Sequence, residues 1–335
     1  MNTRWLTLNR ERRIDILNQA SAATGLPPSV IEKDWWVSLS IQACFSLPFS
    51  EQLVFKGGTS LSKGWNAIER FSEDIDLAID RAYFGFVGEI NKTQIGKLRR
   101  ASCAFISSTF LNDLVQTLTD WGAIHECQLF AHPIAAPDKD PQCIEIQYDS
   151  VLDAIEYLPK RVLIEVGVRS LMEPVELREI NSILSVQFPQ LDLAIKAFPI
   201  PIVLPRRTFL EKIFLLHEEF AQAPEKMRMD RLSRHLYDLE RLMDSEHGVA
   251  ALQDTELYNN IVAHREKFNA IKGVDYSHHT PVKIKIIPPD SAIGAYEKDY
   301  SEMTQFMIYG DALTFAQLIQ RISELQGRIN AIRAV

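Results

Sequence analysis

Residues 55–80 read FKGGTSLSKGWNAIERFSEDIDLAID, and this stretch says more about the fold than any other part of the chain. A short apolar run, residues 53–55, leads into two glycines, after which residues 59–71 follow a helix-like pattern. Polar and apolar residues then alternate strictly over residues 73–80, and a period of two is typical of a half-buried strand. The stretch therefore predicts a strand, a glycine turn, a helix and a second strand.

The glycine turn is a candidate phosphate-binding site. Gly57 and Gly58 carry no side chain, so the backbone can approach a ligand closely. The N–H groups at the start of the following helix, together with the helix dipole, favour an anion. We therefore predict a nucleotide-binding turn formed by Lys56, Gly57, Gly58, Thr59 and Ser60.

Two carboxylates follow on the predicted strand. Asp74 and Asp76 are two residues apart, so both project from one face while Ile75 and Leu77 project from the other. An isolated pair of this kind is more often an exposed strand face. Close to a phosphate-binding turn, however, two adjacent carboxylates indicate a metal site, because they repel unless a cation neutralises them. Oxygen ligands of this type suit Mg²⁺.

A third carboxylate is expected from a neighbouring strand, and Glu165 in RVLIEVGVR (161–169) is the best candidate. A glutamate in the middle of an apolar strand is costly unless it is paired or binds a metal. The alternatives are an ion pair of Glu165 with Arg161 or Arg169, or Glu145 as the third ligand. Three carboxylates with two Mg²⁺ ions would suit a two-metal mechanism, in which the third carboxylate serves as ligand, general base or both.

The rest of the chain predicts a mixed sheet covered by helices, an α/β or α+β fold. We expect an α/β core with N-terminal helices over residues 1–197, and a mainly helical domain over residues 206–335. The expected elements are helices at 9–24, from a cap at Ser29 to about Phe45, and over 93–121, strands at 143–148 and 161–169, a proline-rich linker at 198–205, helices from Arg206, and a loop near 273–295.

Composition narrows the class of protein. The chain has 335 residues, a formal net charge of −8 and 46% hydrophobic residues, values that are typical of a globular protein and unlike those of a basic nucleic-acid coat. Its four cysteines show no CxxC spacing, so neither a zinc site nor a disulfide framework is indicated. The start of the chain has no apolar signal region, so we expect a soluble, cytoplasmic protein.

The sequence resembles the AbiEii/AbiGii toxin family of the DNA polymerase β-like nucleotidyltransferase superfamily. Besides the glycine turn and the paired aspartates, five stretches carry the resemblance: VIEKDWWV (30–37), VLIEVGVRS (162–170), RTFLEKIFLLHEE (207–219), RLSRHLYDLERL (231–242) and EKDYSEM (297–303). The resemblance implies a nucleotidyltransferase fold, Mg²⁺ and NTP as cofactor and substrate, and a cognate antitoxin from an adjacent gene. For some relatives it implies nucleotide addition to the 3′ end of tRNA.

The resemblance also assigns residues in the second half of the chain. The family's lysine falls on Lys212 and its later aspartate on Asp238. Lys212 could bind triphosphate as a point charge, or extend beside a neighbouring glutamate instead. Asp238 could accept a hydrogen bond from Lys212 or from a substrate hydroxyl, or have a structural role alone. Arg234 is a candidate phosphate contact.

Three hypotheses about function follow. The first is a toxin that transfers NMP from NTP to an RNA acceptor, with Asp74, Asp76, Glu165, Lys212 and Asp238 as catalytic residues. The second is an enzyme of the same class that modifies a hydroxyl on a protein or a small molecule. The third is a defence module that binds NTP without catalysis.

Overall fold

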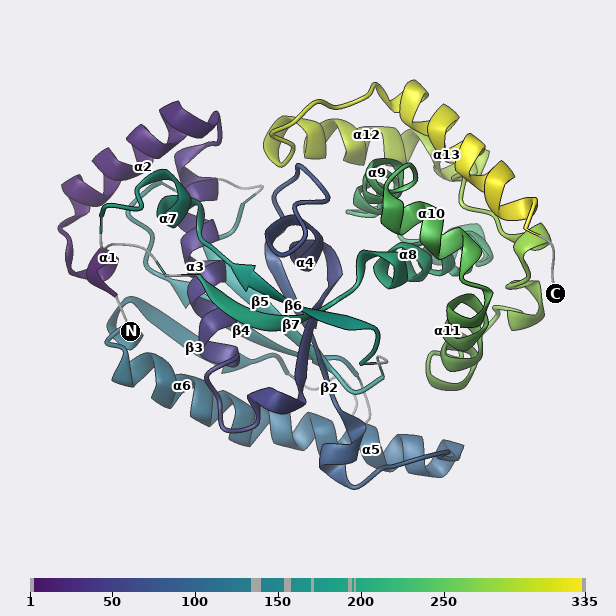
Figure 1. Ribbon diagram of the computed structural model, residues 1–335, viewed down its shortest axis with the longest axis horizontal. Coiled ribbons are helices and arrows are strands. Elements are labelled where there is room, and N and C mark those ends of the chain that lie inside the picture. Colours follow the sequence, from purple (N-terminus) through teal and green to yellow (C-terminus); the bar gives the residue numbers. More distant parts are fainter. Residues whose placement is uncertain are drawn as a thin grey trace. The chain divides into compact units, whose positions relative to one another are not determined.

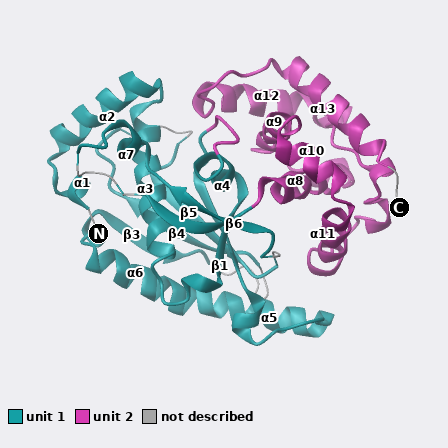
Figure 2. Ribbon diagram, in the orientation of Figure 1, with its two compact units in different colours: residues 1–65, 71–203 teal, residues 66–70, 204–335 magenta. Residues whose placement is uncertain are grey.

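The computed structural model describes residues 3–133, 140–153, 158–169, 172–191, 195 and 197–332. The chain forms two compact units, which Figure 2 shows in different colours. Unit 1 comprises Met1–Trp65 and Phe71–Val203, and unit 2 comprises Asn66–Arg70 and Leu204–Val335. A segment of five residues between two elements of unit 1 thus belongs to unit 2.

Unit 1 is built on a sheet that has seven strands among the described residues, in the order β3-β4-β5-β2-β1-β7-β6 (Figure 1). The strands are β1 (Leu53–Lys56), β2 (Asp74–Ile79), β3 (Cys127–Ala131), β4 (Gln142–Tyr148), β5 (Arg161–Gly167), β6 (Val175–Ile180) and β7 (Phe198–Val203). β2 runs parallel to β5, and β1 runs parallel to β7, whereas the other neighbours are antiparallel. The expected mixed-sheet α+β fold is confirmed.

The helices of unit 1 are α1 (Arg4–Thr7), α2 (Arg10–Thr24), α3 (Pro28–Cys44), α4 (Gly57–Lys63), α5 (Lys92–Phe105), α6 (Leu111–Asp120) and α7 (Ile183–Gln187). A π-helical turn, Ile106–Phe110, joins α5 to α6, so the expected helical region at 93–121 is confirmed. The expected cap at Ser29 is wrong. α3 begins at Pro28, whose missing N–H would have no helical partner at this position, and Pro27 precedes it without a side-chain cap.

Two other expectations are wrong in unit 1. The helix expected at 59–71 ends at Lys63, because the chain turns away through Asn66, which has a positive φ of 49°. The linker expected at 198–205 contains strand β7. Pro199 and Pro201 of β7 occupy alternate positions, so the residues that alternate with them, Phe198, Ile200 and Ile202, keep the N–H groups needed to pair with one neighbouring strand.

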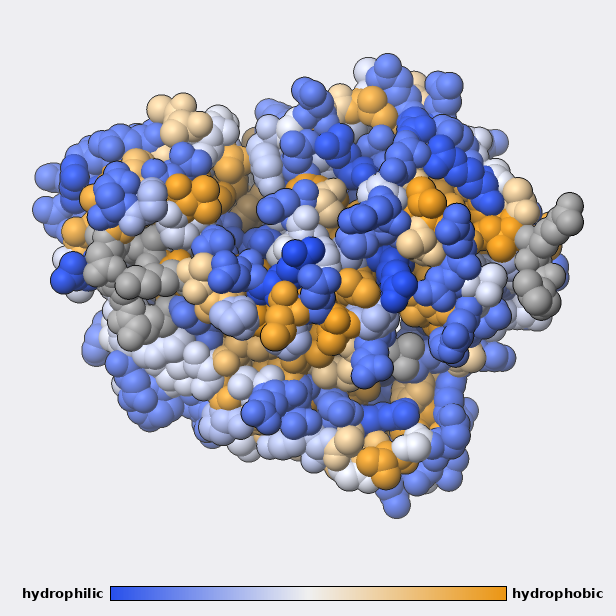
Figure 3. Space-filling model, viewed as in Figure 1, coloured by the Kyte–Doolittle hydropathy of each residue, from blue (hydrophilic) through white to orange (hydrophobic). Residues whose placement is uncertain are grey.

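β6 is an edge strand with an exposed outer surface. Val175 and Leu177 are 39% and 68% exposed, and Figure 3 shows a small group of apolar side chains where Figure 1 places β6 and β7. Glu176 and Glu179 are also exposed on this strand, and Arg178 lies over the ring of Trp65 at 4.1 Å. Charged side chains on an edge strand discourage pairing with another chain.

Unit 2 is helical in the part of the chain that the structure describes, apart from an isolated bridge between Arg70 and Ile308. Its helices are α8 (Pro205–Phe220), α9 (Ser233–Leu242), α10 (Glu246–Gln253), α11 (Thr255–Phe268), α12 (Asp290–Phe306) and α13 (Phe315–Asn330). The expected apolar faces of α8 and α9 are buried. The loop expected at 273–295 is wrong at its end, since α12 begins at Asp290.

Single 3-10 turns link these elements in both units. They are Ser50–Gln52, Arg81–Phe84 and Ile124–Glu126 in unit 1, and Pro224–Lys226, Tyr276–His278 and Pro281–Lys283 in unit 2. No helix among the described residues is at once long enough and apolar enough to cross a membrane.

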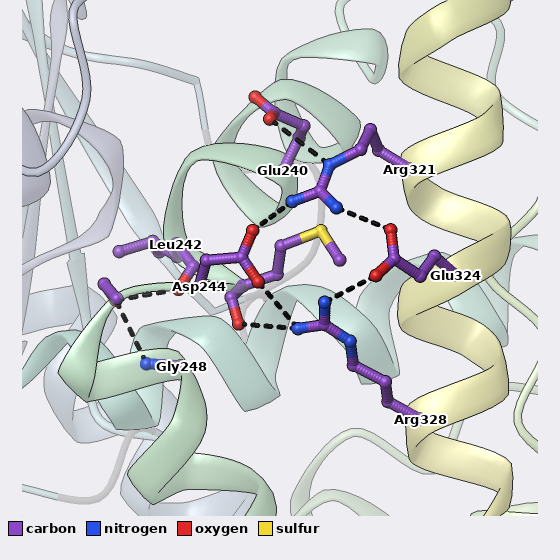
Figure 4. Close-up of polar contacts among 9 residues, drawn as sticks. Glu240, Leu242, Asp244, Gly248, Arg321, Glu324 and Arg328 are labelled. Carbon is purple, nitrogen blue, oxygen red and sulfur yellow. Dashed lines mark hydrogen bonds and ion pairs between the residues drawn. The ribbon is translucent and has the colours of Figure 1, made fainter.

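A network of charged side chains fastens α13 to the segment after α9 (Figure 4). Asp244 accepts from Arg321 through one oxygen and from Arg328 through the other. Glu324, which lies between the two arginines on α13, pairs with both. The apolar side of α13 is buried, with Leu318, Ile322, Leu325 and Ile329 fully covered.

Candidate active site

The paired aspartates lie on β2 as the alternation predicts. Asp74 and Asp76 are half-buried, whereas Ile75 and Leu77 are fully buried against the other face. Both carboxylates therefore project from one face of the sheet, where solvent can reach them.

Glu165 joins this face from the neighbouring strand. β2 and β5 are parallel, and Asp76 stands directly beside Glu165 in their register. Residues that are direct neighbours on parallel strands point to the same side of the sheet, about 5 Å apart at the backbone. Asp74, Asp76 and Glu165 thus share one face of two adjacent strands, and all three are half-buried.

The glycine turn lies directly against one of these carboxylates. Lys56, the last residue of β1, is the register partner of Asp76 on β2. Gly57 has a positive φ of 79°, and a Cβ built on it would lie 1.9 Å from Oδ2 of Asp76. Any side chain at position 57 would therefore displace the Asp76 carboxylate, so the close approach requires glycine.

The hydroxyls beside the turn hold α4 in place. Thr59 donates through Oγ1 to the carbonyl of Asp74 at 2.5 Å, and Ser60 donates to the carbonyl of Gly57 at 2.9 Å. Both residues are fully buried. Because α4 has only seven residues, any affinity for phosphate would come from the open backbone at the glycines rather than from a long helix dipole.

The arginines beside Glu165 form ion pairs with other acids. Arg161 pairs with Glu145 at 3.0 Å, and Arg169 pairs with Asp140 at 2.6 Å. Glu145, the alternative third ligand, is buried and also accepts hydrogen bonds from His132 and Gln147. The pKa of the Glu145 carboxyl is lowered, because these partners outweigh its burial. Glu145 is therefore committed to a structural network.

The pKa of Cys143 reflects its burial and the negative charge of the strand face that carries Asp74, Asp76 and Glu165. It stands opposite Glu165 in the antiparallel register of β4 and β5. Burial raises the pKa of the Cys143 thiol to about 12, with further contributions from the negative charges of Glu165 and Asp74. A face that disfavours another negative charge is a favourable place for a cation.

The three carboxylates offer the oxygen ligands that a hard divalent cation prefers. In the described residues, no three His, Cys, Asp or Glu side chains converge on one point where a metal ion could bind. Binding would therefore require Asp74, Asp76 and Glu165 to turn toward one another on the face they share.

Lys212 and Asp238 form an ion pair inside unit 2. Nζ of Lys212 lies 2.9 Å from Oδ2 of Asp238, which is fully buried. Asp238 thus accepts from Lys212, which was one of its expected partners. Glu211 and Glu219, the neighbours beside which Lys212 could have extended, pair instead with Arg207 and Arg228.

Arg70 also belongs to this cluster and was not predicted. Its Nε and Nη2 donate to the two oxygens of Asp238 at 2.7 and 2.8 Å, and it is 1% exposed. Nothing in the sequence indicated that Arg70 would be buried, and only its burial makes an acidic partner necessary. The identity of that partner, 168 residues away, could not be read from the sequence.

Burial and neighbouring cations shape the chemistry of the cluster. Burial lowers the pKa of Lys212, the Asp238 carboxylate opposes this shift, and Arg70 and Arg234 add to it. The pKa of Asp238 is lowered, because Arg70 and Lys212 outweigh its burial. His235 lies 3.3 Å from Lys212 through Nδ1, and burial together with Lys212 and Arg234 lowers its pKa well below the ordinary value. His235 is therefore neutral at pH 7.

Comparison with known protein families identifies the class of this chain. The family described as nucleotidyl transferase AbiEii toxin, Type IV toxin–antitoxin system, matches residues 43–321, most of the chain. The protein belongs to the AbiEii family. As an AbiEii protein it is a nucleotidyltransferase, and the resemblance seen in the sequence is confirmed.

Comparisons with individual proteins add little to the AbiEii assignment. No curated protein matches the chain. The crystal structure of JHP933 from Helicobacter pylori is similar over 90% of this chain and 97% of that one, with 16% sequence identity and a TM-score of 0.34. We draw nothing from a likeness of that size.

Proposed function

We propose that this AbiEii protein is a Mg²⁺-dependent toxin that transfers NMP from an NTP to the 3′ end of tRNA and releases pyrophosphate. The position of Asp76 carries the proposal. Its carboxylate shares a strand face with Asp74 and stands beside Glu165, and it also lies against the backbone of Gly57. The residues suited to a cation therefore adjoin the turn suited to a triphosphate.

Asp74, Asp76 and Glu165 would hold one or two Mg²⁺ ions through carboxylate oxygens, the ligands that this cation prefers. The bound ions would supply a lowered pKa for the attacking hydroxyl and charge neutralisation for the departing pyrophosphate. Glu165 would also accept the hydroxyl proton on a carboxylate oxygen. The hydroxyl oxygen would bond to the α-phosphorus as the bond from that phosphorus to the β-phosphate oxygen breaks.

The glycine turn of unit 1 would bind the triphosphate. Gly57 and Gly58 would offer backbone N–H groups, with Lys56 beside them. The family's lysine falls on Lys212, and we propose that its ammonium contacts phosphate, with Arg234 as a further phosphate contact. Asp238 would serve the reaction by holding that ammonium at 2.9 Å.

The family description supports the biological part of the proposal. It names a toxin of a Type IV toxin–antitoxin system, and this supports an antitoxin encoded by an adjacent gene as the partner. A toxin that uses NTP and tRNA would act in the cytoplasm, where both are found.

Labelling of the acceptor tests the proposal. Purified protein would be incubated with each α-³²P-labelled NTP, Mg²⁺ and total tRNA, with the Asp74→Asn/Asp76→Asn double variant as the control. We expect label in tRNA that depends on Mg²⁺ and is absent with the double variant. Label in protein or a small product would identify another acceptor, and no label above the control would overturn the proposal.

A further inference from the structure

Three consecutive ionisable residues lie in the buried middle of α3. Glu32, Lys33 and Asp34 are 2%, 1% and 3% exposed, and the residues on either side of them are buried as well. Successive helical residues are about 100° apart around the axis, so the three side chains cannot face the same neighbour. Buried charges are costly unless each is paired. Each of the three should therefore hold a different part of unit 1.

Lys33 ties together the starts of the two strands that bear the carboxylates. Its ammonium donates to the buried carboxylate of Glu73, the residue immediately before Asp74 on β2. The same ammonium donates to the carbonyl of Pro159 at 2.9 Å, two residues before β5 begins at Arg161. A single side chain thus contacts both segments from which β2 and β5 start.

Asp34 holds the other half of the site. One of its oxygens accepts from Lys63, the last residue of α4, and the other accepts from the backbone N–H of Ile183 at 2.7 Å. Lys63 also donates to the carbonyl of Asn181 at 3.0 Å. The far end of the helix that begins at Gly57 is thereby fastened to α3 and to the start of α7.

Glu32 makes contacts of the same kind elsewhere. It accepts from Oγ of Ser150 at 2.6 Å and from the backbone N–H of Val151 at 2.9 Å. Both residues follow β4, which carries none of the three proposed metal ligands. Glu32 is therefore a natural control, since it is an equally buried charge on the same turn of α3 with partners outside the carboxylate strands and the glycine turn.

We propose that Lys33 and Asp34 are positioning residues for nucleotidyl transfer. Lys33 sets β2 against β5, and Asp34 sets α4 against the same helix, so together they fix the three carboxylates relative to the glycine turn. Neither residue touches substrate. The inference rests on the proposed function, because it assigns a purpose to the geometry of that site.

The test compares variants that remove a charge with little change of shape. Asp34→Asn and the double variant Lys33→Met/Glu73→Gln would be compared with Glu32→Gln in the full-length protein. All three lose buried polar contacts, so all should lose stability. We expect kcat to fall at least about tenfold in the first two, with KM for NTP changing less, because small misplacements of reacting groups are costly. Glu32→Gln should retain kcat within about twofold.

Two further measurements do not depend on catalysis. The Mg²⁺·NTP-induced rise in Tm should shrink in Asp34→Asn and in the double variant, but persist in Glu32→Gln. Amide hydrogen exchange should accelerate over residues 57–63 in Asp34→Asn, and at the starts of β2 and β5 in the double variant. Normal exchange there, or kcat and Tm shifts matching those of Glu32→Gln, would overturn the inference. A wild-type protein that transfers no label would overturn the proposed function instead, while exchange would still decide whether Lys33 and Asp34 hold these elements.

Discussion

Arg70 donates from Nε and Nη2 to the two carboxylate oxygens of Asp238, and Lys212 forms an ion pair with one of these oxygens, Oδ2. All three side chains are at least nine-tenths buried. The Asp238 carboxylate therefore neutralises two cations. Its removal would leave Arg70 and Lys212 buried without this negative charge.

We expect Asp238→Asn to lower the free energy of unfolding by about 3–5 kcal/mol, because an uncompensated buried charge is costly. The control is Glu69→Gln, which breaks the partly exposed pair with Arg241 and should cost less than about 1 kcal/mol. Urea unfolding followed by circular dichroism would measure both. Equal losses of unfolding free energy in the two variants would show that the buried ion pairs of Asp238 contribute no more to stability than the partly exposed pair of Glu69.

Gly57→Ala should lower the transfer activity for a reason other than backbone strain. Gly57 and Gly25 have similar positive φ values, 79° and 75°, but a Cβ at Gly25 would meet nothing within 4 Å. Both alanine variants should lose about 1–2 kcal/mol of stability through strain. Only Gly57→Ala pushes Asp76 aside, so its transfer rate should fall about 100-fold. Labelled NTP transfer would check this, and comparable activity in the two variants would contradict it.

Stability should decline in mild acid because of His217. Burial, together with His279, lowers the pKa of His217 from 6.5 to about 4. Between these values the unfolded state binds a proton that the folded state does not, so stability falls as the pH falls from 6.5 to 4. The loss is at most about 3 kcal/mol. Urea unfolding across this range should show a shallower dependence for His217→Gln, and parallel curves would rule out His217 as the source.

Asp244→Asn should loosen the end of the chain without unfolding the protein. Asp244 holds Arg321 and Arg328 of α13, but it is 56% exposed, so the loss should be about 1 kcal/mol or less. The difference from wild type should shrink at high salt. Hydrogen exchange along α13 would measure it, with Glu302→Gln, which breaks a more distant exposed pair with Lys298, as the neutral control. Unchanged hydrogen exchange in α13 would show that Asp244 does not hold this helix in place.

The elements nearest the candidate site were the easiest to predict. β2 is half-buried, so its alternation reports directly which side chains face solvent. The edge strands β3 and β6 are not predicted from the sequence, because few of their side chains are buried. The prolines of β7 predict a linker, since prolines usually interrupt strands, but their alternate spacing leaves the N–H groups of the other residues in place.

The residues of the candidate site also fall into those that the sequence predicts and those that it does not. Asp74 and Asp76 were expected on one face from their spacing alone, and Glu165 was expected from a charge that an apolar strand would not otherwise contain. Lys33 and Arg70 could not be given partners from the sequence, because Glu73 lies 40 residues and Asp238 168 residues away from them. Pairings at such distances follow from the packing of the elements rather than from local pattern.

Unit 2 takes residues 66–70 from the middle of the stretch that builds unit 1, so neither unit is one uninterrupted length of chain. A chimaera that joins the first 203 residues of one relative to the remainder of another would combine Arg70 from one parent with Asp238 from the other. Parents that differ at either position would produce hybrids with a mismatched pair. Grafting residues 66–70 together with 204–335 would keep the pair intact. An exchange of unit 2 between relatives therefore has to include these five residues.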